Sequence, residues 1–124
     1  MSQMVARKLK PESARGLDVY RVSLELIAEY RPWQARIARF NRRLGAQLSE
    51  SLSSTPQNIA EAMRRTGKDR AHLLTVAMGS HDEVRALLDV AVAFGLLPRE
   101  EQQRLDALAD RISAMLYRLR QRAA

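Results

Sequence analysis

Small and apolar residues that recur at intervals of three and four are the feature that most constrains the fold of this chain. Between residues 73 and 94 the intervals are 4, 3, 4, 3, 4 and 3, through Leu73, Ala77, Ser80, Val84, Leu87, Ala91 and Phe94. This spacing places the side chains along one seam of an α-helix. No segment alternates between apolar and polar residues for long enough to form a strand. The sequence therefore predicts an all-α fold.

Three further segments carry a stripe of the same kind. Their residues are Leu17, Tyr20, Leu24 and Ile27; Leu44, Leu48, Leu52, Thr55, Ile59 and Met63; and Leu105, Leu108, Ile112, Met115 and Leu119. Four helices joined by short loops predict an antiparallel up-down-up-down four-helix bundle. Leu74, Leu88 and Val92 widen the apolar face of the third helix, which predicts that this face is buried against another copy of the chain.

The first two connections are ambiguous from the residues alone. Pro32 lacks a backbone donor and favours a break, but apolar residues continue in phase beyond it. Asn41 is the best turn former in this region, so we place the connection near residues 38–43. Pro56 fits either the first turn of a new helix or a kink within one long helix.

The remaining boundaries are marked by glycine, proline and charge. Gly67 fits a left-handed stop for the second helix, and Gly95 fits a stop for the third. Pro98 fits the start of the last helix. Residues 1–15 have no periodic pattern, and we expect a flexible basic arm there, followed by a single domain over residues 16–122.

The chain is strongly basic, with 21 Lys and Arg against 14 Asp and Glu and a net charge of +7, and 18 of these cations are arginine. Such an excess favours an anionic partner such as RNA or DNA, and it also fits a solvated surface that keeps an oligomer soluble. Only six of the 124 residues are aromatic, which predicts recognition by shape and charge instead of by base stacking.

Two arginine-rich segments hold the candidate nucleic-acid-binding residues. Residues 31–43 and residues 111–124 contain several arginines and no acidic residue. Guanidinium groups bind phosphate oxygens in a bidentate manner, so a row of them can follow a phosphate backbone. The candidates are Arg36, Arg39, Arg42, Arg43, Arg111, Arg118 and Arg122.

Several classes of protein are disfavoured. The chain has no cysteine, which excludes disulfides and thiolate metal sites. The longest apolar run, Val90 to Leu97, is too short to span a membrane, and no secretory signal is recognisable, so we expect a cytoplasmic protein without a membrane partner. A di-iron bundle needs two Glu-x-x-His pairs, and only Asp69-x-x-His72 comes close. We therefore expect no catalytic residue, no metal, no cofactor and no enzymatic activity.

Three stretches carry a resemblance to a known family. They are the start Asp18-Val19-Tyr20, the segment S-T-P-Q-N-I-A-E over residues 54–61, and L-L-T-V-A-M-G-S over residues 73–80 with the later Glu83, Leu87 and Gly95. They resemble the bacterial four-helix bundle family that is also called the 23S rRNA intervening-sequence protein family. We interpret its motif positions as structural residues around the proline: Pro56, Asn58, Glu61, Gly79, Ser80 and Glu83. Ala62, His81 and Arg85 depart from the family's usual glycine, apolar and acidic residues.

This resemblance implies more than the residues do by themselves. It implies that the first connection lies near residues 38–43 and that Pro56 sits inside one long second helix. It also implies a homopentamer, and a relation to the accessory variability determinant of diversity-generating retroelements, a basic pentameric bundle that associates with a reverse transcriptase and nucleic acid. The expected function is a non-enzymatic oligomeric bundle that binds nucleic acid, a nucleic-acid enzyme such as a reverse transcriptase, or both. The alternative is a structural or protein-interaction scaffold.

Overall fold

A computed structural model describes residues 11–123, with side chains from residue 18 onward, and this part of the chain consists of helices without strands. The helices are α2 (Pro11–Phe40), α3 (Arg42–Ala62), α4 (Gly67–Ala93) and α5 (Arg99–Ala123). The predicted all-α class with four helices is confirmed. Of the predicted arm over residues 1–15, residues 1–10 lie outside the described part, and from Pro11 onward the backbone is helical.

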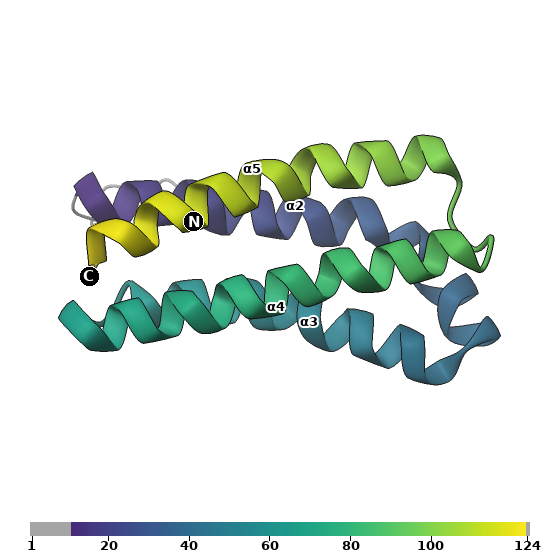
Figure 1. Cartoon of the computed structure of the whole chain (residues 1–124), viewed down its shortest axis with the longest axis horizontal. Helices are drawn as coiled ribbons and strands as arrows, with labels where there is room; N and C mark the ends of the chain where they lie inside the picture. The colour runs from purple at the N-terminus through teal and green to yellow at the C-terminus, as the bar shows by residue number, and fades with distance from the viewer. Residues whose placement is uncertain (1–10, 124) are drawn as a thin grey trace.

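Each helix packs against the helices that precede and follow it in the chain, and α5 closes the bundle against α2. Figure 1 shows that neighbouring helices run in opposite directions, as an up-down-up-down bundle requires. The α2–α3 and α4–α5 connections therefore lie at one end of the bundle. The α3–α4 connection and the carboxyl end of α5 lie at the other end.

Both ambiguous prolines lie inside helices. Pro32 is within α2 and Pro56 is within α3, so the second helix is one long element. The first connection falls at Asn41, inside the predicted range 38–43. Its side chain accepts a hydrogen bond of 3.1 Å from the backbone N–H of Leu44 and so caps α3.

Gly95 ends α4 as predicted. It has a φ of +74°, its N–H donates to the carbonyl of Val92, and the N–H of Leu96 donates to the carbonyl of Ala91, both at 2.9 Å. These two bonds form a Schellman motif. Gly67 is also left-handed, with a φ of +56°, but it opens α4 instead of closing α3, which is a correction to the predicted boundary.

The core uses only part of the predicted seam of α4, since Ala77, Val84 and Ala91 are buried as predicted. Leu73 and Leu87 are only partly buried and Phe94 is exposed, whereas Leu74 and Leu88 are buried in the core. The buried residues of α4 are Ala71, Leu74, Ala77, His81, Val84, Leu88 and Ala91. Leu73, Ser80 and Leu87 of the predicted seam are thus each replaced in the core by the residue that follows them. Leu74 and Leu88 are therefore not part of a spare apolar face for another copy of the chain.

A similar shift occurs on α2. Leu24 is 42% exposed, and the core side chains are instead Val19, Val22, Leu26, Tyr30 and Ile37. The predicted stripe on α3 is buried from Leu44 to Ile59. On α5, Leu105, Ile112 and Leu119 are buried as predicted.

Candidate nucleic-acid interface

Four of the predicted arginines lie at the end of the bundle that carries two connections, which we call the two-loop end (residues 36–43 and 94–98). Arg36 and Arg39 come from the last turns of α2, and Arg42 and Arg43 open α3. All four side chains are exposed, and none forms an ion pair with a described residue. No acidic residue occurs in the chain from residue 30 to residue 49.

The start of α3 has an unusual charge. Its first turn contains Arg42 and Arg43 and no acidic residue. Cations are unfavourable at a helix N-terminus, because the backbone dipole already places positive charge there. These two arginines therefore add to a local positive potential without stabilising the helix. The arginines and the helix N-terminus together favour the binding of an anion.

The α4–α5 connection contributes to the same end. The guanidinium of Arg36 donates a hydrogen bond of 3.3 Å to the carbonyl of Gly95. Of the acidic residues that open α5, Glu101 is paired with Arg104 at 3.3 Å and Glu100 is exposed. The four arginines of the two-loop end thus outnumber the free carboxylates near them.

Two phenylalanines also meet here, and the prediction from sequence missed this contact. Phe40 ends α2 and Phe94 follows α4, and their ring centroids are 5.1 Å apart with the planes inclined by 53°. The two side chains are 55% and 53% exposed. No signal in the sequence pairs them, since they lie on helices that are not consecutive.

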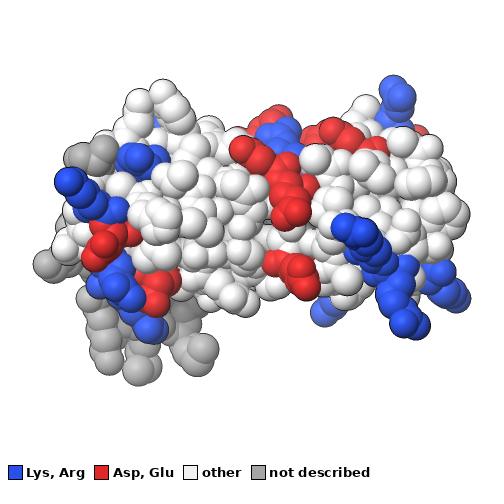
Figure 2. All heavy atoms as spheres, turned by 60° about the horizontal axis from the view of Figure 1, so that its bottom comes forward, with Lys and Arg blue, Asp and Glu red and all other residues white. Residues whose placement is uncertain are grey.

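The arginines of α5 lie elsewhere. Arg118 and Arg122 line a hollow of 250 Å³ beside Asp18, close to the carboxyl end of α5, and Arg111 is exposed midway along the helix. The structure therefore does not bring the two predicted groups together. They approach opposite ends of the bundle. On the face in Figure 2, basic side chains gather toward both ends, and acidic ones lie between the ends and also among the basic ones at the left end.

Acidic residues occupy the middle stretches of α4 and α5. They are Asp82, Glu83, Asp106 and Asp110, and Asp89 lies nearer the carboxyl end of α4, where it accepts a hydrogen bond from Gln102. Burial raises the pKa of Asp106; nearby Arg85 opposes this increase, while Asp89 and Asp110 add to it. Because these carboxylates repel a polyanion, the candidate interface is confined to the ends of the bundle.

The polar motif residues link α3 to α4. Ser51 donates a hydrogen bond of 2.7 Å to the carboxylate of Glu83, and the hydroxyls of Ser54 and Ser80 are 2.8 Å apart. Asn58 donates to the carbonyl and the hydroxyl of Ser54, at 2.9 and 3.0 Å. These contacts lie on both sides of Pro56, whose missing N–H leaves a carbonyl of the preceding turn without its usual donor.

The other two motif residues do not join this network. Glu61 lies 3.6 Å from the guanidinium of Arg65, one turn further along the chain. Gly79 is exposed, and no atom would lie within 4 Å of a Cβ built on it. Within one copy of the described bundle, no neighbouring helix approaches closely at Gly79.

The sequence profile of the 23S rRNA-intervening sequence protein family matches residues 15–118 of the chain. The chain belongs to this family. No curated protein matches it significantly. The matched range includes all of α3 and α4, most of α2 and α5, and the whole network between α3 and α4.

Two departures from the usual residues of the 23S rRNA-intervening sequence protein family form contacts of their own. His81 is 1% exposed, and its Nε2 donates to the carbonyl of Ala109 at 2.9 Å, while Nδ1 has no partner among the described residues. Burial lowers the pKa of His81. Arg85 donates to the carboxylate of Asp110 at 2.6 Å and to the hydroxyl of Ser113 at 3.2 Å. Both residues therefore tie α4 to α5.

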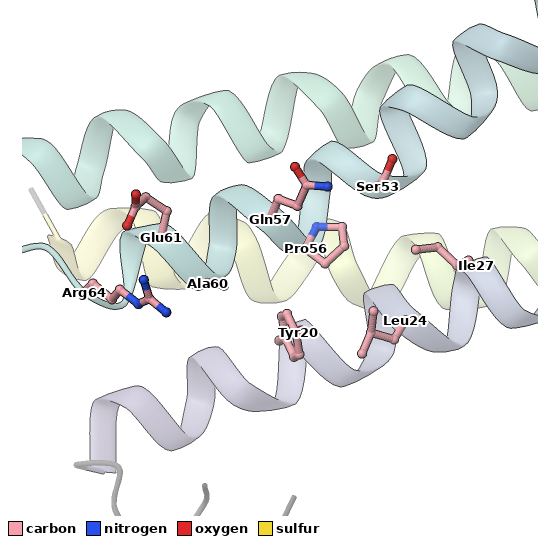
Figure 3. A pocket seen from close by; sticks show the side chains of 9 residues that line it. All are labelled: Tyr20, Leu24, Ile27, Ser53, Pro56, Gln57, Ala60, Glu61 and Arg64. Atoms are coloured by element: carbon pink, nitrogen blue, oxygen red, sulfur yellow. The ribbon is translucent and has the colours of Figure 1, made fainter. Parts of the chain in front are cut away.

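A groove of 450 Å³ lies on the outer face of α2 and α3 in this family member. Figure 3 shows Tyr20 and Leu24 of α2 facing Pro56 across the groove. Three apolar α2 residues that were predicted to enter the core line this groove: Tyr20, Leu24 and Ile27. Tyr20 and Ile27 also pack against the core, whereas Leu24 is exposed.

No group of three metal-ligating side chains occurs among the described residues, and Asp69 and His72 are both exposed. None of the described helices is long and apolar enough to cross a membrane.

Proposed function

We propose that this chain is a non-enzymatic RNA-binding bundle that contacts phosphates through the arginines of the two-loop end. The observation that carries the proposal is the group of four exposed arginines without a carboxylate partner, two of which open a helix: Arg36, Arg39, Arg42 and Arg43. The name of the family, 23S rRNA-intervening sequence protein, favours RNA over DNA as the ligand.

The charge distribution supports this choice of surface. Surface arginines are usually paired with carboxylates or kept apart from one another, because unpaired like charges repel each other. The two-loop end keeps four of them together at the positive end of α3. Phosphate oxygens satisfy guanidinium groups and helix N-terminal amides at the same time.

Arg111, Arg118 and Arg122 form a second proposed contact region. A helix as long as α5, with 25 residues, spans roughly 37 Å at about 1.5 Å per residue. One short RNA segment therefore does not reach both arginine groups of a single copy. We propose a homo-oligomer, with five copies as the expected number, in which each group is repeated and weak phosphate contacts become multivalent.

Affinity for a labelled structured RNA tests the proposal, with fluorescence anisotropy at low salt as the readout. The variant Arg39→Gln/Arg42→Gln/Arg43→Gln removes three charges from the two-loop end. The matched control Arg64→Gln/Arg65→Gln/Lys68→Gln removes three exposed charges at the α3–α4 connection, at the opposite end of the bundle. We expect the first variant to bind at least about tenfold more weakly and the control to lose much less.

Two results would contradict this account. Equal losses in the two variants would mean that only total charge matters. Absence of RNA binding by the unmodified protein would favour the alternative function. In that case the bundle is a scaffold that contacts a protein, such as a reverse transcriptase, and does not bind nucleic acid. Light scattering of the same samples measures the number of copies, and a monomer would overturn the proposed oligomer.

A further inference from the structure

We infer that the Phe40–Phe94 pair is a stacking platform for unpaired bases, so that the two-loop end selects single-stranded over duplex RNA. This inference rests on the proposed function, since it specifies which kind of RNA the arginines hold. It also revises the expectation that recognition depends on shape and charge alone.

The exposure of both rings is the first observation. Phe40 and Phe94 are the only two phenylalanines in the chain. More than half of each side chain is exposed, although phenylalanine is among the residue types most often buried. Their rings contact each other across two separate connections and form one apolar surface.

The rings are also held in place by ordered backbone. Phe40 is the last residue of α2, and the cap of α3 at Asn41 follows directly. Phe94 precedes Gly95, whose N–H is bonded to Val92 and whose carbonyl accepts from Arg36. A fixed ring loses little conformational entropy when a base stacks on it.

The surrounding charge decides which partner fits this surface. Arg39 precedes Phe40 by one residue, and Arg42 follows it by two. A second copy of the chain docked through the same face would bring arginines against arginines, which is unfavourable. A single-stranded RNA matches both the rings and the arginines. Its bases present flat π faces to the rings, and its phosphates present negative charge to the arginines.

A duplex gains less from this surface. Its bases are already stacked on one another, and only phosphates and groove edges are accessible. Duplex binding should therefore depend on the arginines and be insensitive to the two rings.

The test compares an oligoadenylate of about 12 nucleotides with an RNA duplex of about the same length, by fluorescence anisotropy at one salt concentration. The variant Phe40→Leu/Phe94→Leu keeps the surface apolar and removes the rings. Tyr117→Leu is the matched control, because Tyr117 is another exposed aromatic residue, on α5. Circular dichroism establishes that each variant keeps its helical content.

We expect the double variant to bind the oligoadenylate about five- to 150-fold more weakly, the range that loss of one stacked base produces. Its affinity for the duplex and both affinities of the Tyr117→Leu protein should change by less than about twofold. Unchanged oligoadenylate binding in the double variant would overturn the stacking platform while leaving arginine-mediated binding in place. If the unmodified protein bound neither RNA, the proposed function itself would fail.

Discussion

Gly45 of α3 lies against Ala38 of α2 so closely that a Cβ built on Gly45 would be 2.7 Å from the Cα of Ala38 and 2.8 Å from its Cβ. The two helices therefore meet backbone to backbone just beyond the Asn41 cap. This contact fixes the direction in which α3 leaves α2, and with it the positions of the arginines on either side of the turn.

The variant Gly45→Ala should therefore be destabilised. Alanine has a higher helix propensity than glycine by about 1 kcal/mol, but the added methyl group would have to push two backbones apart. We expect the free energy of unfolding to fall by about 1–3 kcal/mol, the usual cost of overpacking. Chemical denaturation monitored by circular dichroism measures this change.

The variant Gly79→Ala provides the matched control. Gly79 also lies inside a helix, but it is exposed and has no neighbour within 4 Å of a built Cβ. Its replacement should raise the free energy of unfolding by about 0.5–1 kcal/mol. The same loss of stability in both variants would contradict the close contact at Gly45 as the cause.

Removal of the Tyr30 hydroxyl should not destabilise the bundle. Tyr30 is 2% exposed, its hydroxyl has no partner among the described residues, and burial raises its pKa to about 12. A buried hydroxyl without a hydrogen bond costs about 1–3 kcal/mol. Tyr30→Phe should therefore be as stable as the unmodified protein or more stable, by thermal and chemical unfolding. Tyr117→Phe, at an exposed site, serves as the reference, and a loss of more than about 1 kcal/mol in Tyr30→Phe alone would mean that its hydroxyl has a partner.

His81 should make the stability of the bundle depend on pH. Burial lowers its pKa in the folded state from 6.5, so on acidification the unfolded chain binds a proton before the folded one does. Stability is therefore fully present above about pH 6.5 and decreases as the pH falls below it, by at most about 1.4 kcal/mol per pH unit.

The variant His81→Leu isolates this effect. Its free energy of unfolding should change less between pH 7.5 and pH 5.5 than that of the unmodified protein. Replacement of the exposed histidine, His72→Gln, should leave the original pH dependence in place. A His81→Leu protein that kept the full acid sensitivity would show that another group is responsible.

The sequence predicted the helices better than it predicted their faces. Spacings of three and four identify helices, and Asn41 and Gly95 mark two of their ends through local hydrogen bonds. On α4, Ala77, Val84 and Ala91 of the predicted seam are buried, but Leu73 and Leu87 are only partly buried. The core takes Leu74, His81 and Leu88 in place of Leu73, Ser80 and Leu87, because apolar residues at neighbouring positions leave the exact direction of the buried face open.

The candidate site shows a similar division. The arginines between residues 36 and 43 could be identified because acidic residues are absent around them. The contact between Phe40 and Phe94 could not, since it depends on which helix ends meet in space. The separation of Arg118 and Arg122 from the first group, by contrast, already follows from the predicted up-down-up-down order, which directs the end of α5 away from the two-loop end.

The central claim, that the arginines of the two-loop end bind RNA phosphates, is tested most directly by the salt dependence of binding. The affinity of the unmodified protein and of Arg39→Ala/Arg42→Ala/Arg43→Ala for a single-stranded RNA is measured over a series of salt concentrations. Each lost phosphate contact should reduce the log–log slope by about 0.7, so three lost contacts should reduce it by about 2. The same slope for both proteins would contradict the claim, because the three arginines would then neutralise no phosphate.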